Sequence, residues 1–462
     1  MMNKNFFRMG LIVALSLIQV QCTKIEREDP VIAEEELRNK LTLSQYYNAM
    51  YLGSDFARFP LMWMQQLSGV RGSHLQVENY NPVMAHFDDT WQLFYFNLVR
   101  EMSLLEYYAV ELNAPRFSGM GLAMQAWMFG LVTDAWGDVP FSEAYKYHGM
   151  GSNPVYDGQE AVYNAIFKTL DDSMEMLETP VEGTLVPRPS DDFYYEGDVE
   201  KWKKFVRFLR LRHTLRLNHL SGDYSGALAL VQAGGMFESV ADDLVFPFAN
   251  MAELENPWYL FDYAIGNTRV GAFLVDRLQA TDDPRLGKYV RLTTQNERIG
   301  AAPGSENLNA SRIANSGGTI GSQNAGLTMA GYSEQKFIEA EVYHRMGMPA
   351  QADAAYAAAV IASLEMHQAR NAQWEEEHAL REQVSLEDIM TAKYVALFLN
   401  PEVWTDWRRT GYPVFETVPP ANQNGDLVPR RLLYPAFEEQ NNPVNFPLNV
   451  DINTRVWWDR VE

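Results

Sequence analysis

The fold class is decided by residues 332–366, where the chain is YSEQKFIEAEVYHRMGMPAQADAAYAAAVIASLEM. Apolar side chains recur four positions apart in the first half of this stretch, at Ile338, Val342 and Met346. This spacing is typical of one face of an α-helix, and Gly347 and Pro349 are the residue types expected just past a helix end. An alanine-rich segment over 352–366 then repeats the spacing. The stretch predicts a tetratricopeptide-like hairpin of two antiparallel helices, although no strict 34-residue period follows.

Other segments share this helical spacing, and they are separated by long polar stretches. Helices are predicted at 91–112, 118–136, 157–174, 199–220 and 385–399. The stretches 250–267 and 291–331 are rich in Gly, Asn, Ser and Thr, and 411–462 is rich in Pro and Asn. We therefore expect an all-α, mainly helical chain with long irregular loops, folded as one domain over 37–462.

The charge balance excludes some classes of partner. The chain has 60 acidic and 38 basic residues, for a formal charge of −22. Nucleic acids and anionic membranes attract basic surfaces, so neither is an expected partner. One dense basic run occurs between 201 and 216, and we expect it to neutralise acidic neighbours. Its members are Lys201, Lys203, Lys204, Arg207, Arg210, Arg212 and Arg216.

The N-terminus resembles an export signal. Lys4 and Arg8 precede an apolar run that is too short to span a bilayer, and the run ends near Cys22, the single cysteine of the chain. We expect a signal peptide at 1–21, lipidation of Cys22 and a flexible acidic tether over 22–36. Cleavage by an ordinary signal peptidase is the alternative, and Gln21 departs from the small residue usual before a lipidated cysteine.

Motifs for catalysis or metal binding are missing from the sequence. It contains no His-Glu-x-x-His motif, no Gly-x-Ser-x-Gly elbow and no Gly-Lys-Ser/Thr phosphate loop. His213 and His219 are six residues apart, which is the wrong spacing for two ligands on one helix face. We expect no cofactor and no metal site. A pair of carboxylates brought together by folding is the open alternative, because such a pair is enough for a glycoside hydrolase.

Two groups of polar and aromatic residues outside the helical patterns are candidates for ligand contact. Sugar rings stack on Trp and Tyr, and side-chain amides, carboxylates and guanidinium groups bond to their hydroxyl groups. The first candidate group is Trp63, His74, Asn79 and Tyr80. The second is Asn256, Trp258, Tyr259, Asp262, Tyr263, Asn267 and Arg269. Burial as loop anchors is the alternative for each residue, and we expect one of the two groups to contact ligand.

Seven local motifs, in order along the chain, resemble those of the SusD/RagB-like lipoproteins. The most recognisable is TDAWGDVPFSEA at 133–144, which matches the family's GDVP corner. The other six are PVYDGQEAVY at 154–163, YEGD at 195–198 with the helix that follows, DPRL at 283–286, SE and AE at 333–334 and 340–341, WTDWRRTGYP at 404–413, and RRLLYP at 430–435.

The resemblance implies a non-enzymatic, cell-surface lipoprotein of a Bacteroidota-type outer membrane. Such proteins bind a nutrient glycan and pass it to a SusC-like TonB-dependent barrel, which they cover as a lid. Capture of oligopeptides is the alternative within the family, and a purely structural lipoprotein is the alternative outside it. The acidic residues after Cys22 resemble the signal that sends such lipoproteins to the cell surface.

The same motifs have a structural explanation that needs no ligand. Gly137 and Pro140 bracket a turn after a helix. Asp134 and Asp138 are expected to cap backbone groups. Arginines of the last two motifs are expected to pair with carboxylates across packed helices, because the planar guanidinium suits partly buried ion pairs. These arginines are Arg408, Arg409 and Arg431.

Overall fold

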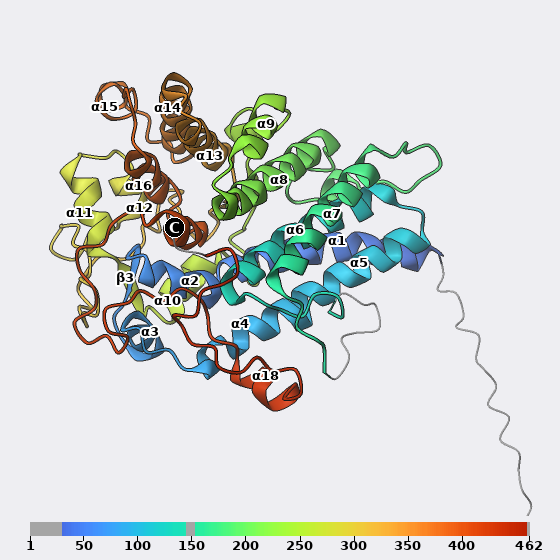
Figure 1. Cartoon of the computed structure of the whole chain (residues 1–462), viewed down its shortest axis with the longest axis horizontal. Helices are drawn as coiled ribbons and strands as arrows, with labels where there is room; N and C mark the ends of the chain where they lie inside the picture. The colour runs from blue at the N-terminus through green and yellow to red at the C-terminus, as the bar shows by residue number, and fades with distance from the viewer. Residues whose placement is uncertain (1–29, 145–152, 460–462) are drawn as a thin grey trace, which may run out of the picture.

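The computed structural model describes residues 30–144 and 153–459. The predicted signal peptide and Cys22 lie outside this part of the chain. Within it, helices dominate, and the strands form two short antiparallel pairs (Figure 1). The predicted mainly helical class is therefore confirmed.

Five long helices lie side by side in one half of the molecule (Figure 1). They are α1 (Pro30–Leu52), α5 (Val99–Glu111), α6 (Pro115–Trp136), α7 (Gln159–Glu178) and α8 (Val199–Ser221). Helix α6 packs against α1, α5, α7 and α8 and is buried along nearly its whole length. A helix that is apolar on all sides belongs in the centre of a core, which is where α6 lies.

Glycines let the neighbouring helices approach α6 closely. A Cβ atom at Gly119 would lie 2.7 Å from Cγ of Leu177, and one at Gly130 would lie 2.5 Å from Cε1 of His213. Glycine weakens a helix interior by about 1 kcal/mol relative to alanine. Here that cost is offset by close packing of α6 against α7 and α8.

The predicted hairpin is present in the other half of the molecule. Helix α13 (Tyr332–Arg345) is joined to α14 (Pro349–Met366) by a turn in which Gly347 has a φ of +67°. The two helices share a second apolar core with α16 (Leu386–Ala396), which packs on both. Spacing and turn residues therefore predicted this part of the fold correctly.

Several predicted boundaries shift by a few residues, and three predicted segments differ from the structure in the type or division of their elements. Residues 30–36, expected in the tether, form the first turns of α1, because buried Ala33 and Leu37 continue its inner face. The segment 91–112 is divided into α4 (Asp88–Gln92), the π-helical turn η2 (Leu93–Leu98) and α5. The stretch 250–267, expected as a loop, contains α10 (Pro257–Ala264), which begins at a proline after a capping asparagine.

The strand pairs join segments that are far apart in the sequence. Strand β1 (Leu67–Gly69) pairs with β3 (Thr268–Val270), with Ser68 opposite Arg269. Strand β2 (Leu244–Phe246) pairs with β4 (Leu327–Ala330). The first pair holds the segment after α2 (Asp55–Trp63), including α3 (Gly72–Glu78), next to the segment that follows α10.

The remaining elements are short. They are α9 (Ser225–Ala233), α11 (Ala272–Ala280), α12 (Leu286–Tyr289), α15 (Ala372–His378), α17 (Glu402–Thr410), α18 (Ala436–Asn441) and the 3-10 turns η1 (Met84–Phe87), η3 (Pro189–Asp191) and η4 (Val240–Asp242). The C-terminal stretch is largely irregular, as predicted. It covers the end of α6, where the backbone N–H of Leu432 donates to the carbonyl of Ala135 over 2.9 Å.

Candidate functional site

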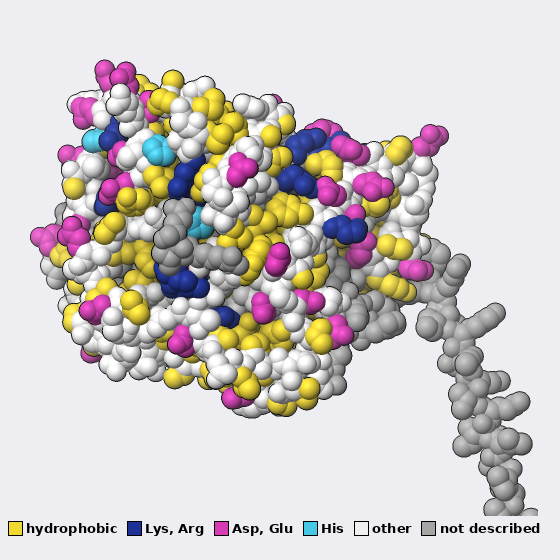
Figure 2. All heavy atoms as spheres, viewed as in Figure 1, with side chains coloured by type: hydrophobic (Ala, Val, Ile, Leu, Met, Phe, Trp, Pro, Cys, Tyr) yellow, Lys and Arg dark blue, Asp and Glu magenta, His cyan; other side chains and the backbone are white. Residues whose placement is uncertain are grey.

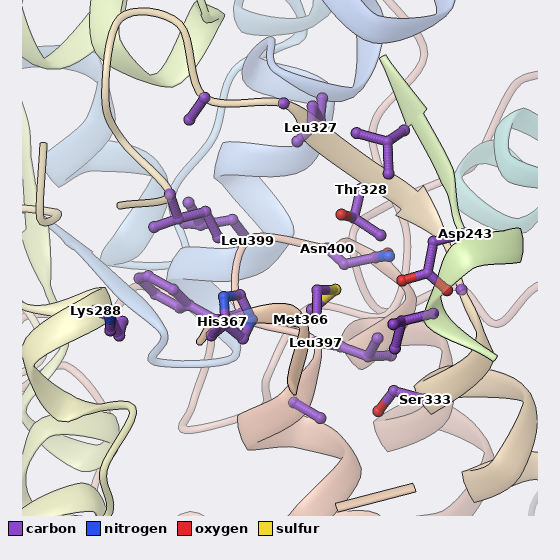
Figure 3. Close-up of a pocket in the computed structure, with 18 of the residues that line it drawn as sticks. Asp243, Lys288, Leu327, Thr328, Ser333, Met366, His367, Leu397, Leu399 and Asn400 are labelled. Carbon is purple, nitrogen blue, oxygen red and sulfur yellow. The ribbon is translucent and has the colours of Figure 1, made fainter. Parts of the chain in front are cut away.

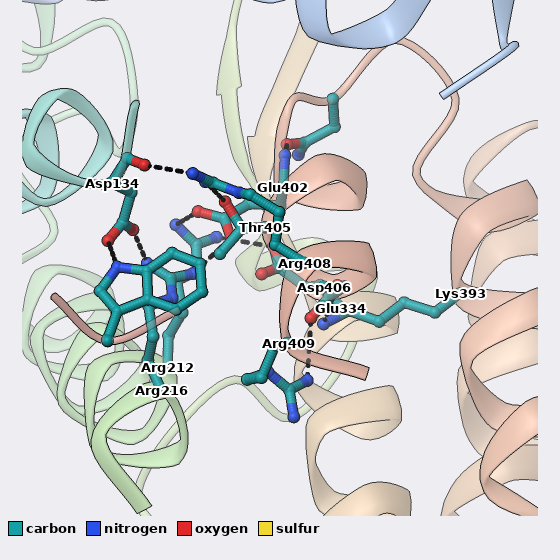
Figure 4. Close-up of polar contacts among 12 residues, drawn as sticks. Asp134, Arg212, Arg216, Glu334, Lys393, Glu402, Thr405, Asp406, Arg408 and Arg409 are labelled. Atoms are coloured by element: carbon teal, nitrogen blue, oxygen red, sulfur yellow. Dashed lines mark hydrogen bonds and ion pairs between the residues drawn. The ribbon is translucent and has the colours of Figure 1, made fainter. Parts of the chain in front are cut away.

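Motif residues, together with Lys393 and Glu402, form a buried network of ion pairs between α6, α8, α13, α16 and α17 (Figure 4). Arg212 pairs with Glu334 at 2.6 Å, and Lys393 pairs with Asp406 at 2.7 Å. Arg216 bridges Asp134 and Glu402. We call these residues, with Arg409 and Glu341, the ion-pair network. Its charges are almost completely buried, so it holds helices together and offers no surface to a ligand.

Arg409 and Glu341 are the most buried pair of the network. Arg409 Nη2 lies 2.6 Å from one carboxylate oxygen of Glu341, and Nη1 contacts the other oxygen. Burial alone would raise the pKa of Glu341, but the guanidinium groups of Arg409 and Arg345 together outweigh it and lower that pKa. A bidentate pair of this kind is strong, and removing one partner leaves a buried charge.

The individual expectations for these motif residues have mixed outcomes. Arg409 pairs with a carboxylate as predicted, but Arg408 and Arg431 donate to backbone carbonyls instead, including those of Asp134 and Trp136 respectively. Asp138 accepts the N–H of Gln159 at the start of α7, which confirms the predicted cap. Asp134 accepts from side chains, because the interior around it supplies charged and aromatic donors within reach.

The basic run on α8 is surrounded by acids, as predicted. Lys204 bonds to Asp242 over 3.0 Å and also contacts Glu238, and Lys203 bonds to Glu200 over 2.9 Å. Figure 2 shows acidic side chains scattered around the edge of one face, with Lys and Arg atoms gathered over α8 and toward the middle.

The two candidate groups of ligand contacts converge. Pairing of β1 with β3 places α3 next to the segment that follows α10, and Figure 1 shows α2, α3, β3 and α10 close together. Arg71, just before α3, donates to Asn267 Oδ1 over 2.6 Å and to the carbonyl of Ile265. We call the surface formed by α3, α10 and the loop after α10 the α3–α10 face.

Most of the first group packs inward. Trp63 is fully buried, donates to the carbonyl of Val77 over 2.9 Å and packs against Trp404. Tyr80 is also buried. The ring of His74 packs against Phe261, with centroids 5.0 Å apart, and its Nε2 lies 3.2 Å from Asp55. Asn79 is half-buried at the end of α3.

The second group contributes anchors as well as exposed residues. Asn256 is buried and caps α10 by accepting the N–H of Trp258 over 2.8 Å. Trp258 is buried too, with the guanidinium of Arg58 over its ring. These two residues therefore fix the start of α10, which explains their types without a ligand.

Two tyrosines of the second group present aromatic surface to solvent. The side chain of Tyr263 is 79% exposed, and its ring lies nearly parallel to that of half-buried Tyr259, with centroids 5.9 Å apart and planes 11° apart. Residues four apart lie on the same side of a helix. The pair therefore forms an exposed aromatic surface on a rigid element, held in place by the buried start of α10.

Four arginines lie around Asp262 at the end of α10, and three of them were not predicted. Arg312 lies 3.2 Å from one oxygen of Asp262, and Arg291 lies 3.9 Å from the other. Burial raises the pKa of Asp262, although these arginines oppose the rise. The predicted Arg269 and the additional Arg71 complete the set. Sequence reasoning missed Arg71, Arg291 and Arg312 because they come from separate segments and match no motif.

A separate cavity of about 530 Å³ lies between β2, β4, α14 and the segment 396–400. Figure 3 shows Asp243 and Ser333 at one end of it and Lys288 near the other, with His367 between Lys288 and Met366. Burial and nearby acids raise the pKa of Asp243 to about 7. None of the predicted ligand contacts lines this cavity. Its walls come from distant segments, so no local pattern could have indicated it.

The described residues show neither a metal site nor a membrane span. No group of three or more His, Cys, Asp or Glu side chains among them is arranged to hold a metal ion. In the same part of the chain, no helix is both long and apolar enough to span a membrane.

Comparisons with known proteins identify the fold. A solved chitin-binding protein is 25% identical and superimposes with a TM-score of 0.77 over 92% of this chain and 99% of its own. A chitin-binding SusD homologue from Flavobacterium johnsoniae is 20% identical, with a TM-score of 0.76 over 93% and 98%. A SusD homologue from Bacteroides uniformis ATCC 8492 is 22% identical, with a TM-score of 0.74 over 94% and 100%.

No curated protein matches the sequence. The SusD-like family described as starch-binding and associating with the outer membrane matches residues 32–435, which is most of the chain. The order of the seven motifs, the helical fold and this match agree, and the chain belongs to the SusD-like family.

Proposed function

We propose that the protein binds oligosaccharides at the cell surface through the α3–α10 face. The observation that carries this proposal is the exposed, nearly parallel pair of Tyr259 and Tyr263 on a helix whose start is buried. Apolar C–H faces of sugar rings stack on such aromatic surfaces. The solved neighbours named as chitin-binding support the same class of ligand.

In this proposal the protein is anchored through a lipid on Cys22 and acts as the lid of a SusC-like TonB-dependent barrel. Delivery needs no covalent step, only a difference in affinity between the free and barrel-bound states. Support comes from the family match and the lone cysteine behind an export-like N-terminus. Affinity purification from the native membrane, followed by mass spectrometry, is expected to recover a TonB-dependent barrel. A chain that purifies without one contradicts the delivery role.

The proposed function involves binding and not turnover. The most deeply buried carboxylates of the motifs, Glu341 and Glu334, contact arginines and serve the ion-pair network. The cavity acid Asp243 is the strongest candidate for a general acid, because burial raises its pKa to about 7. A hydrolase would lose turnover in Asp243→Asn but keep binding, so that variant distinguishes the two functions.

The test is calorimetric titration of the detergent-solubilised full chain with chito-oligosaccharides, malto-oligosaccharides and short peptides, with product analysis of every mixture. We expect saturable binding of a glycan without breakdown. Tyr263→Ala is expected to weaken it roughly tenfold, because losing about 1.4 kcal/mol of stacking contact changes Kd by a factor of ten.

The matched control is Phe96→Ala, which removes a 43% exposed aromatic side chain on η2. It should bind like the parent. Equal affinity in Tyr263→Ala and the parent would contradict the assignment of the face. If only peptides bind, the ligand class is peptides and not glycans. Breakdown of any ligand would overturn the binding function.

A further inference from the structure

The α3–α10 face carries an excess of positive charge on an otherwise acidic protein. Arg71, Arg269, Arg291 and Arg312, which we call the arginine cluster, lie close enough that the other three act together with burial to lower the pKa of Arg269 to about 10. Within residues 30–144 and 153–459, Asp262 is the one carboxylate paired with any of them. The formal charge of the chain is −22, so the excess is local.

Backbone carbonyls compensate this excess only in part. Arg269 donates to the carbonyls of Leu308, Gly266 and Thr268 over 2.7–3.1 Å, and it is buried. Arg71 and Arg312 donate to carbonyls at the end of α10. A helix C-terminus supplies about half a negative charge. The four guanidinium groups carry four positive charges, and the carboxylate and the helix end together supply about one and a half negative charges. More than two positive charges are therefore left over.

Three of the arginines have donors available to a ligand. Arg71 is exposed, and the side chains of Arg291 and Arg312 are 38% and 31% exposed. Arg71 bonds through Nε and Nη2, Arg291 through Nη1 to Asn315 Oδ1, and Arg312 through Nη1. One terminal nitrogen of each therefore has no hydrogen-bond partner among the described residues. Guanidinium N–H groups form strong, charge-assisted hydrogen bonds with oxyanions, which suit these free donors.

The arginine cluster adjoins the tyrosine pair. Asp262 is three residues after Tyr259 and precedes Tyr263, and positions three and four apart lie on one side of a helix. The carboxylate of Asp262 holds Arg312 and lies near Arg291, so both guanidinium groups gather beside the same part of α10. A sugar stacked on Tyr263 would therefore carry its substituents next to the arginines.

We propose that the ligand of the α3–α10 face is an anionic glycan, whose carboxylate or sulfate groups bind the arginine cluster while its sugar rings stack on Tyr259 and Tyr263. This specificity rests on the proposed function, because it assigns the substrate class of the same face. The oxyanion supplies the negative charge that the cluster lacks.

The test uses pairs of oligosaccharides that differ only in charge, titrated into the detergent-solubilised full chain. One pair is tetragalacturonic acid and its methyl ester, which distinguishes a carboxylate. The other is a chondroitin sulfate tetrasaccharide and its desulfated form, which distinguishes a sulfate. We expect the anionic member of at least one pair to bind at least tenfold more tightly, and its affinity to fall as NaCl is raised.

Variants separate the charge contribution from the stacking contribution. Arg312→Gln is expected to reduce the preference for the anionic member to about threefold or less. Tyr263→Ala should weaken both members by similar factors. Arg100→Gln is the control, since it removes the same charge from a 69% exposed side chain on α5, and it should keep the full preference.

The possible failures are distinguishable. If neutral glycans bind as tightly as anionic ones and Tyr263→Ala weakens both, the anionic specificity is wrong and the proposed function stands. If an anionic glycan binds but Arg312→Gln keeps the full preference, the arginine cluster is not its site. If no glycan binds at all, the proposed function fails, and the inference that rests on it fails too.

Discussion

Arginines gather in two regions of this protein, and their partners differ. In the ion-pair network, Arg409 and Glu341 are both buried and bind each other through two hydrogen bonds. On the α3–α10 face, Arg291 and Arg312 share the carboxylate of Asp262, and these two and Arg71 reach solvent. Charges are nearly balanced in the first region and unbalanced in the second.

The carboxylates show the same difference. The pKa of buried Glu341 is lowered, because Arg409 and Arg345 together outweigh the effect of burial. The pKa of Glu78, which is buried in α3, is raised to about 8 by burial, and hydrogen bonds such as that from Ser68 offset only part of the effect. A balanced, buried network contributes to stability, whereas a region that leaves charges unbalanced is where we expect ligand binding.

The largest expected effect is on the balanced region. Arg409→Gln should lower the free energy of unfolding by about 3–5 kcal/mol, because it leaves the buried charge of Glu341 with only Arg345, whose Nε is 3.6 Å away. Urea unfolding curves monitored by circular dichroism measure this loss of stability. The exposed pair of Arg188 and Glu35 supplies the control, since Arg188→Gln should cost less than about 1 kcal/mol. Equal costs in the two variants would mean that the network is not a stability element.

The next effect concerns pH and the buried carboxyl of Glu78. Its pKa in the folded protein, about 8, is above the ordinary value of 4.5, so the folded state holds a proton that the unfolded state releases. Its contribution to stability is therefore complete below about pH 4.5 and is lost as pH rises to 8, by at most about 1.4 kcal/mol per pH unit.

Glu78→Gln cannot ionise, so we expect it to lose less stability than the parent between pH 5 and pH 8. Urea midpoints across that range measure the difference. The exposed Glu111→Gln variant on α5 should follow the parent. A Glu78→Gln profile parallel to that of the parent would show that this carboxyl does not set the pH dependence.

The smallest effect is expected in the arginine cluster itself. Arg312→Gln should change the free energy of unfolding by less than about 1 kcal/mol, because its ion pair with Asp262 is partly exposed and its loss relieves repulsion among the arginines. Thermal melts at low and high NaCl measure this change, and added salt should reduce it. A loss as large as that in Arg409→Gln would make the cluster a structural element like the network.

The fold was more predictable from the sequence than the candidate site. Apolar spacing located α6, α7, α8, α13 and α14, because each buries one face or more in a core. The same reasoning selected Trp63 and Trp258 as ligand contacts because they lie outside the helical patterns. Both are buried, since an aromatic residue with no local periodicity can still be an anchor of the core.

The sequence alone determined the helical class, the hairpin at Gly347 and the family motifs, because these depend on residues close together in the chain. Only the tertiary structure decided which candidates reach solvent and which charges meet. Pairing of β1 with β3 brings residues 67–69 next to 268–270, so Arg71 joins Arg269, Arg291 and Arg312 around the end of α10, although they lie far away in the sequence. Hydrogen bonds between distant backbone segments set that arrangement, and no local pattern of residue types encodes them.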